Sequence, residues 1–126
     1  MVKWLLWAAV AAYVIGIWWL SSQGEQITAK VDAAGITDFN AHFILFGGLS
    51  FLLRLALYFT WPASPGWLLS TSAAAGTFAY GAIDEWHQSF VPGRGADAQD
   101  LTGDLIGALG GQLLAALCIW GWRRLF

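Results

Sequence analysis

The sequence predicts an all-α integral membrane protein, a bundle of four transmembrane helices. Its composition is the first reason: 58% of the 126 residues are apolar and only 11% are charged, whereas a soluble domain carries about 25% charged residues. A chain this short cannot enclose so many apolar side chains in one aqueous core, because a small domain leaves much of its surface exposed. Lipid must therefore be part of its solvent.

The second reason is the presence of four apolar runs, each long enough to cross about 30 Å of hydrocarbon. They cover about residues 2–20, 38–58, 67–90 and 100–122. A signal peptide is the competing interpretation of the first run, but that run ends in Trp18, Trp19 and Leu20 without a small-residue cleavage pattern. The polar connection 21–37 suits a short surface helix or a loop. We expect a single domain over residues 1–126.

Proline and tryptophan mark the ends of these runs. Pro62 and Pro65 follow the second run, and Pro92 with Gly93 follows the third. Proline lacks a backbone donor and disfavours helix in the residue before it. The nine tryptophans cluster near the ends of the runs, where an indole prefers the headgroup region; packing in a core is the alternative.

Basic residues predict the orientation. If the N-terminus is inside, the cytoplasmic side receives Lys3, Arg54, Arg123 and Arg124, and the opposite side receives only Lys30 and Arg94. The excess of basic residues favours an N-in, C-in, multi-pass topology. Arg54 lies near the end of the second run, and we expect its long side chain to reach the cytoplasmic interface.

All acidic residues fall on the opposite, extracytoplasmic side. They are Glu25, Asp32, Asp38, Asp84, Glu85, Asp97, Asp100 and Asp104. Acids hardly affect insertion, so this asymmetry indicates function rather than topology. Intramembrane ionisable residues normally face protein or a water-filled cavity, and this side is where we expect a site.

Helical spacing predicts which polar groups meet. Asp84, His87 and Gln88 stand at i, i+3 and i+4, while Asp38 and His42, like Asp100 and Asp104, stand at i and i+4. Such residues share a helix face. Arg94 is the nearby cation and could pair with a carboxylate. The candidate ligand-binding residues are Asp38, His42, Asp84, Glu85, Gln88, Arg94, Asp100 and Asp104.

Two interpretations of these groups remain open. They could form a satisfied network that holds the helices together, or a site for a polar headgroup or an ion. The candidates for acid–base catalysis are Asp84, Glu85, His87 and His42, and those for metal binding are Asp84, Asp100 and Asp104, although no spacing matches a recognised ligand motif. The sequence specifies no cofactor. A net charge of −2 argues against nucleic acid, which requires a basic stripe.

Small residues predict how the helices pack. Gly103, Gly107 and Gly111 recur every fourth residue, a spacing that lets membrane helices approach closely. We expect this ridge to pack within the chain, in a tight bundle of the second to fourth runs. Dimerisation through the ridge is the alternative, so a monomer or a small homo-oligomer is expected.

One stretch resembles a known family. Asp84-Glu85-Trp86-His87-Gln88-Ser89-Phe90-Val91-Pro92-Gly93-Arg94, followed by Asp100, Gly107 and Gly110 and preceded by Asp38 and His42-Phe43, is similar to the motifs of VanZ-like membrane proteins. The likeness covers about residues 38–111. It implies a bacterial cytoplasmic-membrane protein from a family associated with low-level teicoplanin resistance. Two positions depart from the family pattern: Phe39 replaces a frequent lysine, and Asp104 a frequent asparagine.

Together these observations favour a cell-envelope protein whose polar side binds a ligand. The expected ligands are a membrane lipid headgroup, a lipid-linked cell-wall precursor or a glycopeptide. One alternative is a metal-assisted enzyme acting on a lipid-linked substrate, with Asp84 or Glu85 as general base. Another is a small transporter component, which the confinement of acids to one side disfavours.

Overall fold

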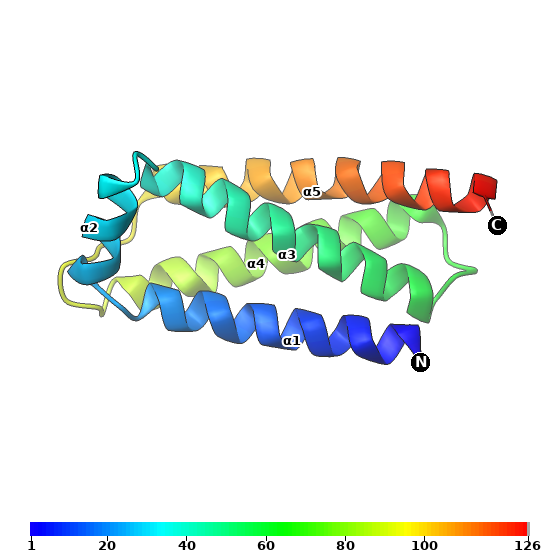
Figure 1. The fold of residues 1–126 in the computed structure, drawn as a ribbon, viewed down its shortest axis with the longest axis horizontal. Helices are drawn as coiled ribbons and strands as arrows, with labels where there is room; N and C mark the ends of the chain where they lie inside the picture. The colour runs from blue at the N-terminus through cyan, green and yellow to red at the C-terminus, as the bar shows by residue number, and fades with distance from the viewer. Residues whose placement is uncertain (126) are drawn as a thin grey trace.

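Four long helices and one short helix make up the structure, a computed structural model that describes residues 1–125. They are α1 (Val2–Ser21), α2 (Glu25–Ala33), α3 (Asp38–Thr60), α4 (Gly66–Gln88) and α5 (Ala98–Leu125). The long helices run side by side, and α2 crosses one end of the bundle (Figure 1). The two chain termini lie at the opposite end (Figure 1). We call these the α2 end and the terminal end.

The four predicted runs correspond to α1, α3, α4 and α5, with shifts of only a few residues at their ends. The polar connection 21–37 was expected to be a short surface helix or a loop, and it contains the short helix α2. Glycines bound α2: Gly24 has φ 63° and Gly35 has φ 73°, a backbone conformation that favours glycine. Thr37 then caps α3 by accepting a hydrogen bond from the backbone N–H of Asn40 at 3.2 Å.

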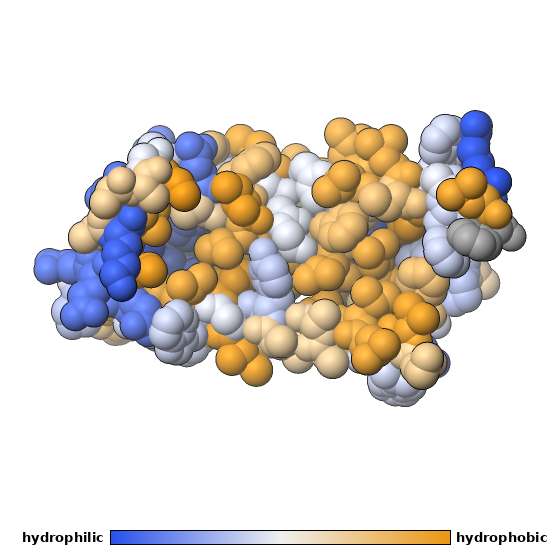
Figure 2. All heavy atoms as spheres, in the orientation of Figure 1, coloured by the Kyte–Doolittle hydropathy of each residue, from blue (hydrophilic) through white to orange (hydrophobic). Residues whose placement is uncertain are grey.

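Three of the helices, α1, α3 and α5, are long and apolar enough to cross a membrane. The helix α4 has 23 residues, as many as α3, but serines, threonines and two acids make it more polar. Figure 2 shows apolar residues over the middle of the bundle and hydrophilic residues gathered mainly at the α2 end, with a smaller group at the terminal end. The structure therefore has the polarity of a membrane protein.

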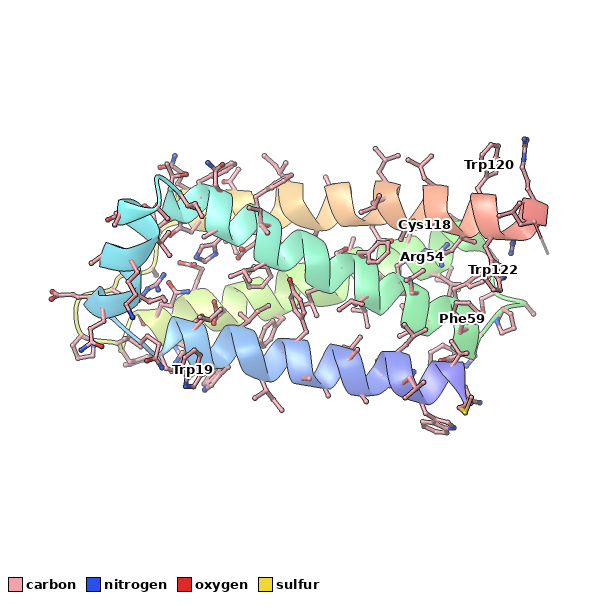
Figure 3. The ribbon with its side chains drawn as sticks, in the orientation of Figure 1. Trp19, Arg54, Phe59, Cys118, Trp120 and Trp122 are labelled. Atoms are coloured by element: carbon pink, nitrogen blue, oxygen red, sulfur yellow. The ribbon has the colours of Figure 1, made fainter. Side chains whose placement is uncertain are left out.

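Every tryptophan except Trp7 is exposed. Trp19 lies on the outside of the bundle near the α2 end, and Trp120 lies near the terminal end (Figure 3). The exposed tryptophans therefore do not pack in the core, which was the alternative prediction for these side chains. Their positions at helix ends match the headgroup levels of a bilayer.

The closest helix contact is between α3 and α5. A Cβ atom at Gly107 would meet the backbone of Phe43, and one at Gly111 would meet the backbone carbonyl of Gly47. A Cβ at Gly103 would lie 3.0 Å from the carbonyl oxygen of Phe39. The glycine ridge predicted from the sequence thus packs within the chain, and α3 covers the surface that the dimer alternative requires.

Polar side chains join the helices in the apolar middle. Ser50 of α3 donates a hydrogen bond to the carbonyl of Ala108 at 2.8 Å, and Gln112 of α5 donates to the Ser50 hydroxyl at 2.7 Å. Tyr80 of α4 donates to the carbonyl of Val14 in α1 at 2.8 Å. Such bonds hold membrane helices together where lipid offers no hydrogen-bond partner.

The side chain of Arg54 contacts the first turn of α4. This side chain is only 5% exposed and lies inside the bundle (Figure 3). Its Nε donates to the hydroxyl of Ser70 at 3.1 Å, and its Nη2 donates to the carbonyl of Gly66 at 3.3 Å. Because this first turn of α4 lies at the terminal end (Figure 1), the reach of Arg54 to the cytoplasmic interface stays a prediction.

We expect Gly107→Ala to destabilise the bundle. The added methyl group would meet the backbone of Phe43, which cannot move aside without shifting α3, and overpacking of this kind costs about 1–3 kcal/mol. Gly121→Ala is the matched control on the same helix, because a Cβ there meets nothing within 4 Å. Thermal unfolding in detergent, followed by circular dichroism, would measure both. Equal melting temperatures for the two variants would contradict the close α3–α5 contact.

Candidate functional site

The polar groups of the α2 end form two neighbouring clusters inside the bundle. In the first, which we call the Asp84 cluster, Ser21 and Gln88 donate hydrogen bonds to the same oxygen, Oδ2 of Asp84, at 2.8 and 2.9 Å. Asp84 and Gln88 are each 1% exposed. Their i, i+4 spacing on α4 places both on the face that packs inward, and Ser21 reaches them from the last turn of α1.

The second cluster, which we call the His42 cluster, surrounds one imidazole with three carboxylates. His42 donates from Nδ1 to Oδ1 of Asp104 at 2.8 Å. Oε1 of Glu85 lies 3.6 Å from the same nitrogen, and Oδ2 of Asp100 lies 3.9 Å from Nε2. All four residues are buried. The cluster thus joins α3, α4 and α5 at their ends.

Four oxygens in these clusters have no hydrogen-bond partner among the residues that the structure describes. They are Oδ1 of Asp84, Oε1 of Glu85, Oε1 of Gln88 and Oδ2 of Asp104. A buried polar atom without a partner is costly, and most buried polar groups in proteins are satisfied. All four atoms are acceptors, so the clusters together lack donors or positive charge. This imbalance favours a site over a satisfied network.

A cavity of about 110 Å³ opens beside both clusters. Asp38, His42, Asp84, Gln88 and Arg94 supply its polar wall, and α2 covers it with Ile27, Thr28 and Val31. Within residues 1–125, Arg94 makes no ion pair, so the expected pairing of this guanidinium with a carboxylate is not formed. Arg94 instead lines the cavity, directly after a turn in which Gly93 has φ 78°.

An apolar groove of about 470 Å³ runs along α1 and α3 next to this cavity. Leu20 of α1 and Leu45 of α3 line both the cavity and the groove. The groove continues past Ile17 and Gly16 toward Ala9. The cavity and the groove therefore adjoin at the α2 end, where Leu20 and Leu45 line both.

Some predicted residues lie apart from the two clusters. His87, a catalytic candidate, stacks on Trp18 with ring centroids 3.9 Å apart and places Nε2 2.9 Å from the hydroxyl of Ser22. Of the metal-ligand candidates, Asp100 and Asp104 face His42, whereas Asp84 bonds to α1 through Ser21. The metal candidates therefore do not meet as one set.

Two residues in the site were not predicted from the sequence. Ser21 anchors Asp84, and its only sequence signal is that it ends the first apolar run on the acidic side. Gly81 lies against the carboxylate of Asp104, where a Cβ would come within 2.5 Å of Oδ2. A lone glycine in an Ala- and Gly-rich helix gives no sign of such a role.

Fold and site together define a class: an all-helical membrane protein with a buried histidine–carboxylate site at one end of its bundle. A protein-family model described as VanZ/LLP1 matches residues 6–119, and the chain belongs to this family. The resemblance seen in the sequence motifs is thereby confirmed. The comparisons with curated proteins and with solved structures each found no match.

The buried His42–Asp104 pair predicts a coupled effect on stability. Removing one partner leaves the other buried without compensation, which costs about 3–5 kcal/mol. We therefore expect His42→Ala and Asp104→Ala together to cost less than the sum of the two single variants, with a coupling of about 0.5–3 kcal/mol. Chemical unfolding of all three variants would measure it. The pair His87→Ala and Asp104→Ala, which share no partner, should be additive; strict additivity for His42 as well would refute the pairing.

Proposed function

We propose that this protein binds a membrane amphiphile, with the polar headgroup in the cavity and the hydrocarbon chain in the groove between α1 and α3. One observation carries the proposal: a cavity whose lining includes charged side chains adjoins an apolar groove, and Leu20 and Leu45 line both. An amphiphile needs such adjoining spaces. A purely polar ligand would use the cavity alone. If the polar groups served only to hold the helices together, neither the cavity nor the groove would be needed.

The lining residues specify the headgroup. Arg94 offers a guanidinium to a phosphate or carboxylate. Among the other lining residues, Asp84 and Gln88 each have one oxygen without a partner, Oδ1 and Oε1, and each oxygen needs an N–H or O–H donor. A headgroup that combines a phosphate with an ammonium or with hydroxyl groups would match both kinds of lining group. Phosphoethanolamine is the simplest lipid headgroup with this pattern.

Lipid-linked cell-wall precursors and teicoplanin are competing ligands for the same site. Family membership is the reason to include them, since the VanZ resemblance implies a link to teicoplanin resistance. Both should be tested as displacers of a lipid probe. A displacer that is sensitive to the same substitutions as the lipid would identify the physiological ligand class.

We further propose that α4 is a fourth span and that the α2 end is extracytoplasmic. Both acids of α4, Asp84 and Glu85, are buried inside the bundle, so the outward face of this helix carries no acidic or basic side chain between Trp67 and Trp86. Such a face can meet lipid. The excess of basic residues at the terminal end favours placing that end in the cytoplasm.

Thiol labelling would test this topology. In a Cys118→Ala background, we expect Ala96→Cys to react with a membrane-impermeant maleimide in intact cells, and Ala63→Cys to react only after permeabilisation. Both positions are exposed, and they lie in the turns at opposite ends of α4. The reversed pattern would place the α2 end in the cytoplasm. The same pattern at both positions would show that α4 does not cross the membrane.

Binding of single-chain lipids would test the ligand. We expect the full chain in detergent to bind a lysophosphatidylethanolamine about tenfold or more tightly than a lysophosphatidylcholine, measured by native mass spectrometry. The choline headgroup has no N–H to donate to Asp84 and Gln88, and a hydrogen bond to a charged group contributes about 1.5–3 kcal/mol, which is roughly a factor of ten or more in affinity. Arg94→Gln should weaken both lipids, because both carry phosphate.

Matched controls separate the headgroup from the chain. Lys30→Gln removes an exposed cation at the same end and should leave binding unchanged. Gly16→Phe would fill the groove, because a Cβ at Gly16 meets nothing within 4 Å, and it should weaken both lipids equally. Gly121→Phe, also in open space, should have no effect. Binding that survives both Arg94→Gln and Gly16→Phe would reject the proposal.

A further inference from the structure

We infer that the His42 cluster binds a divalent metal ion of the zinc type, at a site distinct from the lipid groove. His42, Glu85 and Asp100 each offer one ligand atom, and these atoms all lie within 4.8 Å of one another. Bonds from zinc to nitrogen or to carboxylate oxygen are about 2.0–2.2 Å long, so two ligands of a tetrahedral ion stand about 3.4 Å apart. The ligand atoms must therefore close by up to about 1.4 Å, a movement that rotation of the Glu85 and Asp100 side chains would supply.

Charge is the first argument for a cation. Glu85, Asp100 and Asp104 surround one imidazole, and their side chains are at most 11% exposed. Even a protonated His42 supplies only one positive charge against three carboxylates. No other ion pair reaches these carboxylates in the described part of the chain, residues 1–125, and Arg94 faces the cavity without forming one. Ionised carboxylates are costly where water is scarce; protonation relieves part of that cost, and a divalent ion would relieve it for the carboxylates that bind the ion.

Unpartnered oxygens are the second and independent argument. Oε1 of Glu85 has no hydrogen-bond partner, although Glu85 is only 5% exposed. The same atom lies 3.6 Å from His42 Nδ1, so it is aimed into the cluster. The other oxygen of Glu85 is already used, because it accepts from the backbone N–H of Asp97 at 2.9 Å. Glu85 is thus fixed at one oxygen and has the other available for an ion.

The hydrogen bond to Asp104 prepares His42 for metal binding. His42 donates from Nδ1 to Asp104 at 2.8 Å, which leaves Nε2, the nitrogen on the Asp100 side, with its lone pair available. Histidines that bind metals usually donate their other ring N–H to a carboxylate in this way, and the carboxylate fixes the ring and raises its basicity. Asp104 is therefore a positioning residue rather than a ligand.

The donor set selects the class of ion. One imidazole with two carboxylates suits zinc, whereas magnesium and calcium prefer oxygen donors alone. Three protein ligands leave a fourth position open on a tetrahedral ion. Because His42 also lines the cavity, that position can take water or an anionic group of a ligand there. The binding of the ion itself requires no lipid.

Zinc titration of the purified full chain would test the site. In lipid-free detergent, competition against a chromophoric zinc indicator should reveal one saturable site per chain. We expect His42→Ala and Asp100→Asn each to weaken it by about tenfold or more, and Asp104→Asn to weaken it by about 10–100-fold, as for other residues that hold a metal-binding histidine. His87→Ala removes the other histidine, which stacks on Trp18, and should leave affinity unchanged.

Three outcomes would overturn the inference. They are the absence of a saturable site, binding that survives His42→Ala, and binding that His87→Ala removes instead. Should His42→Ala fail to fold, Glu85→Gln keeps the test open, because it preserves the shape of the side chain and removes only its charge. Substitution of cobalt for zinc gives a second readout, since the visible spectrum of the ion reports a tetrahedral site with nitrogen and oxygen ligands.

Discussion

The close approach of α3 and α5 is the contact on which the remainder of the structure depends. Glycines at positions 103, 107 and 111 let the backbones meet without intervening side chains. Membrane helices gain little from hydrophobic association, because lipid is as apolar as their side chains, so packing at small residues must supply the attraction. The same contact fixes the site, because it places His42 within hydrogen-bond distance of Asp104.

The acidic side chains of the α2 end point into the bundle because exposure to lipid is costly for them. A carboxylate is costly to expose to lipid, and Asp84, Glu85 and Asp104 are buried in the interior shared by the helices. The helix α2 and the turn at Gly93 then close the end of the bundle over them. What results is a partly enclosed cavity, with charged side chains among its lining residues, beside an apolar groove.

Sequence patterns predicted the helices well and the site only in part. Hydropathy and prolines placed the long helices, and i, i+4 spacing correctly paired Asp84 with Gln88 on one inward face. The same spacing rule also included His87, yet one position along the helix turns that side chain onto Trp18. Arg94 was expected to pair with acids because opposite charges were near in sequence. Its loop instead holds the guanidinium at the cavity wall, a placement that no local pattern encodes.

The sequence by itself determined the solvent, the helices, the glycine ridge and the family, because hydropathy, proline positions and a contiguous motif are local properties of the chain. Only the tertiary structure decided which acids share the histidine, that Ser21 reaches Asp84 from α1, and that Arg54 ends on α4 rather than in water. These outcomes depend on distances between side chains far apart in sequence. Such distances are set by how closely the helices pack and how they rotate against one another, which the residues of one helix cannot specify alone.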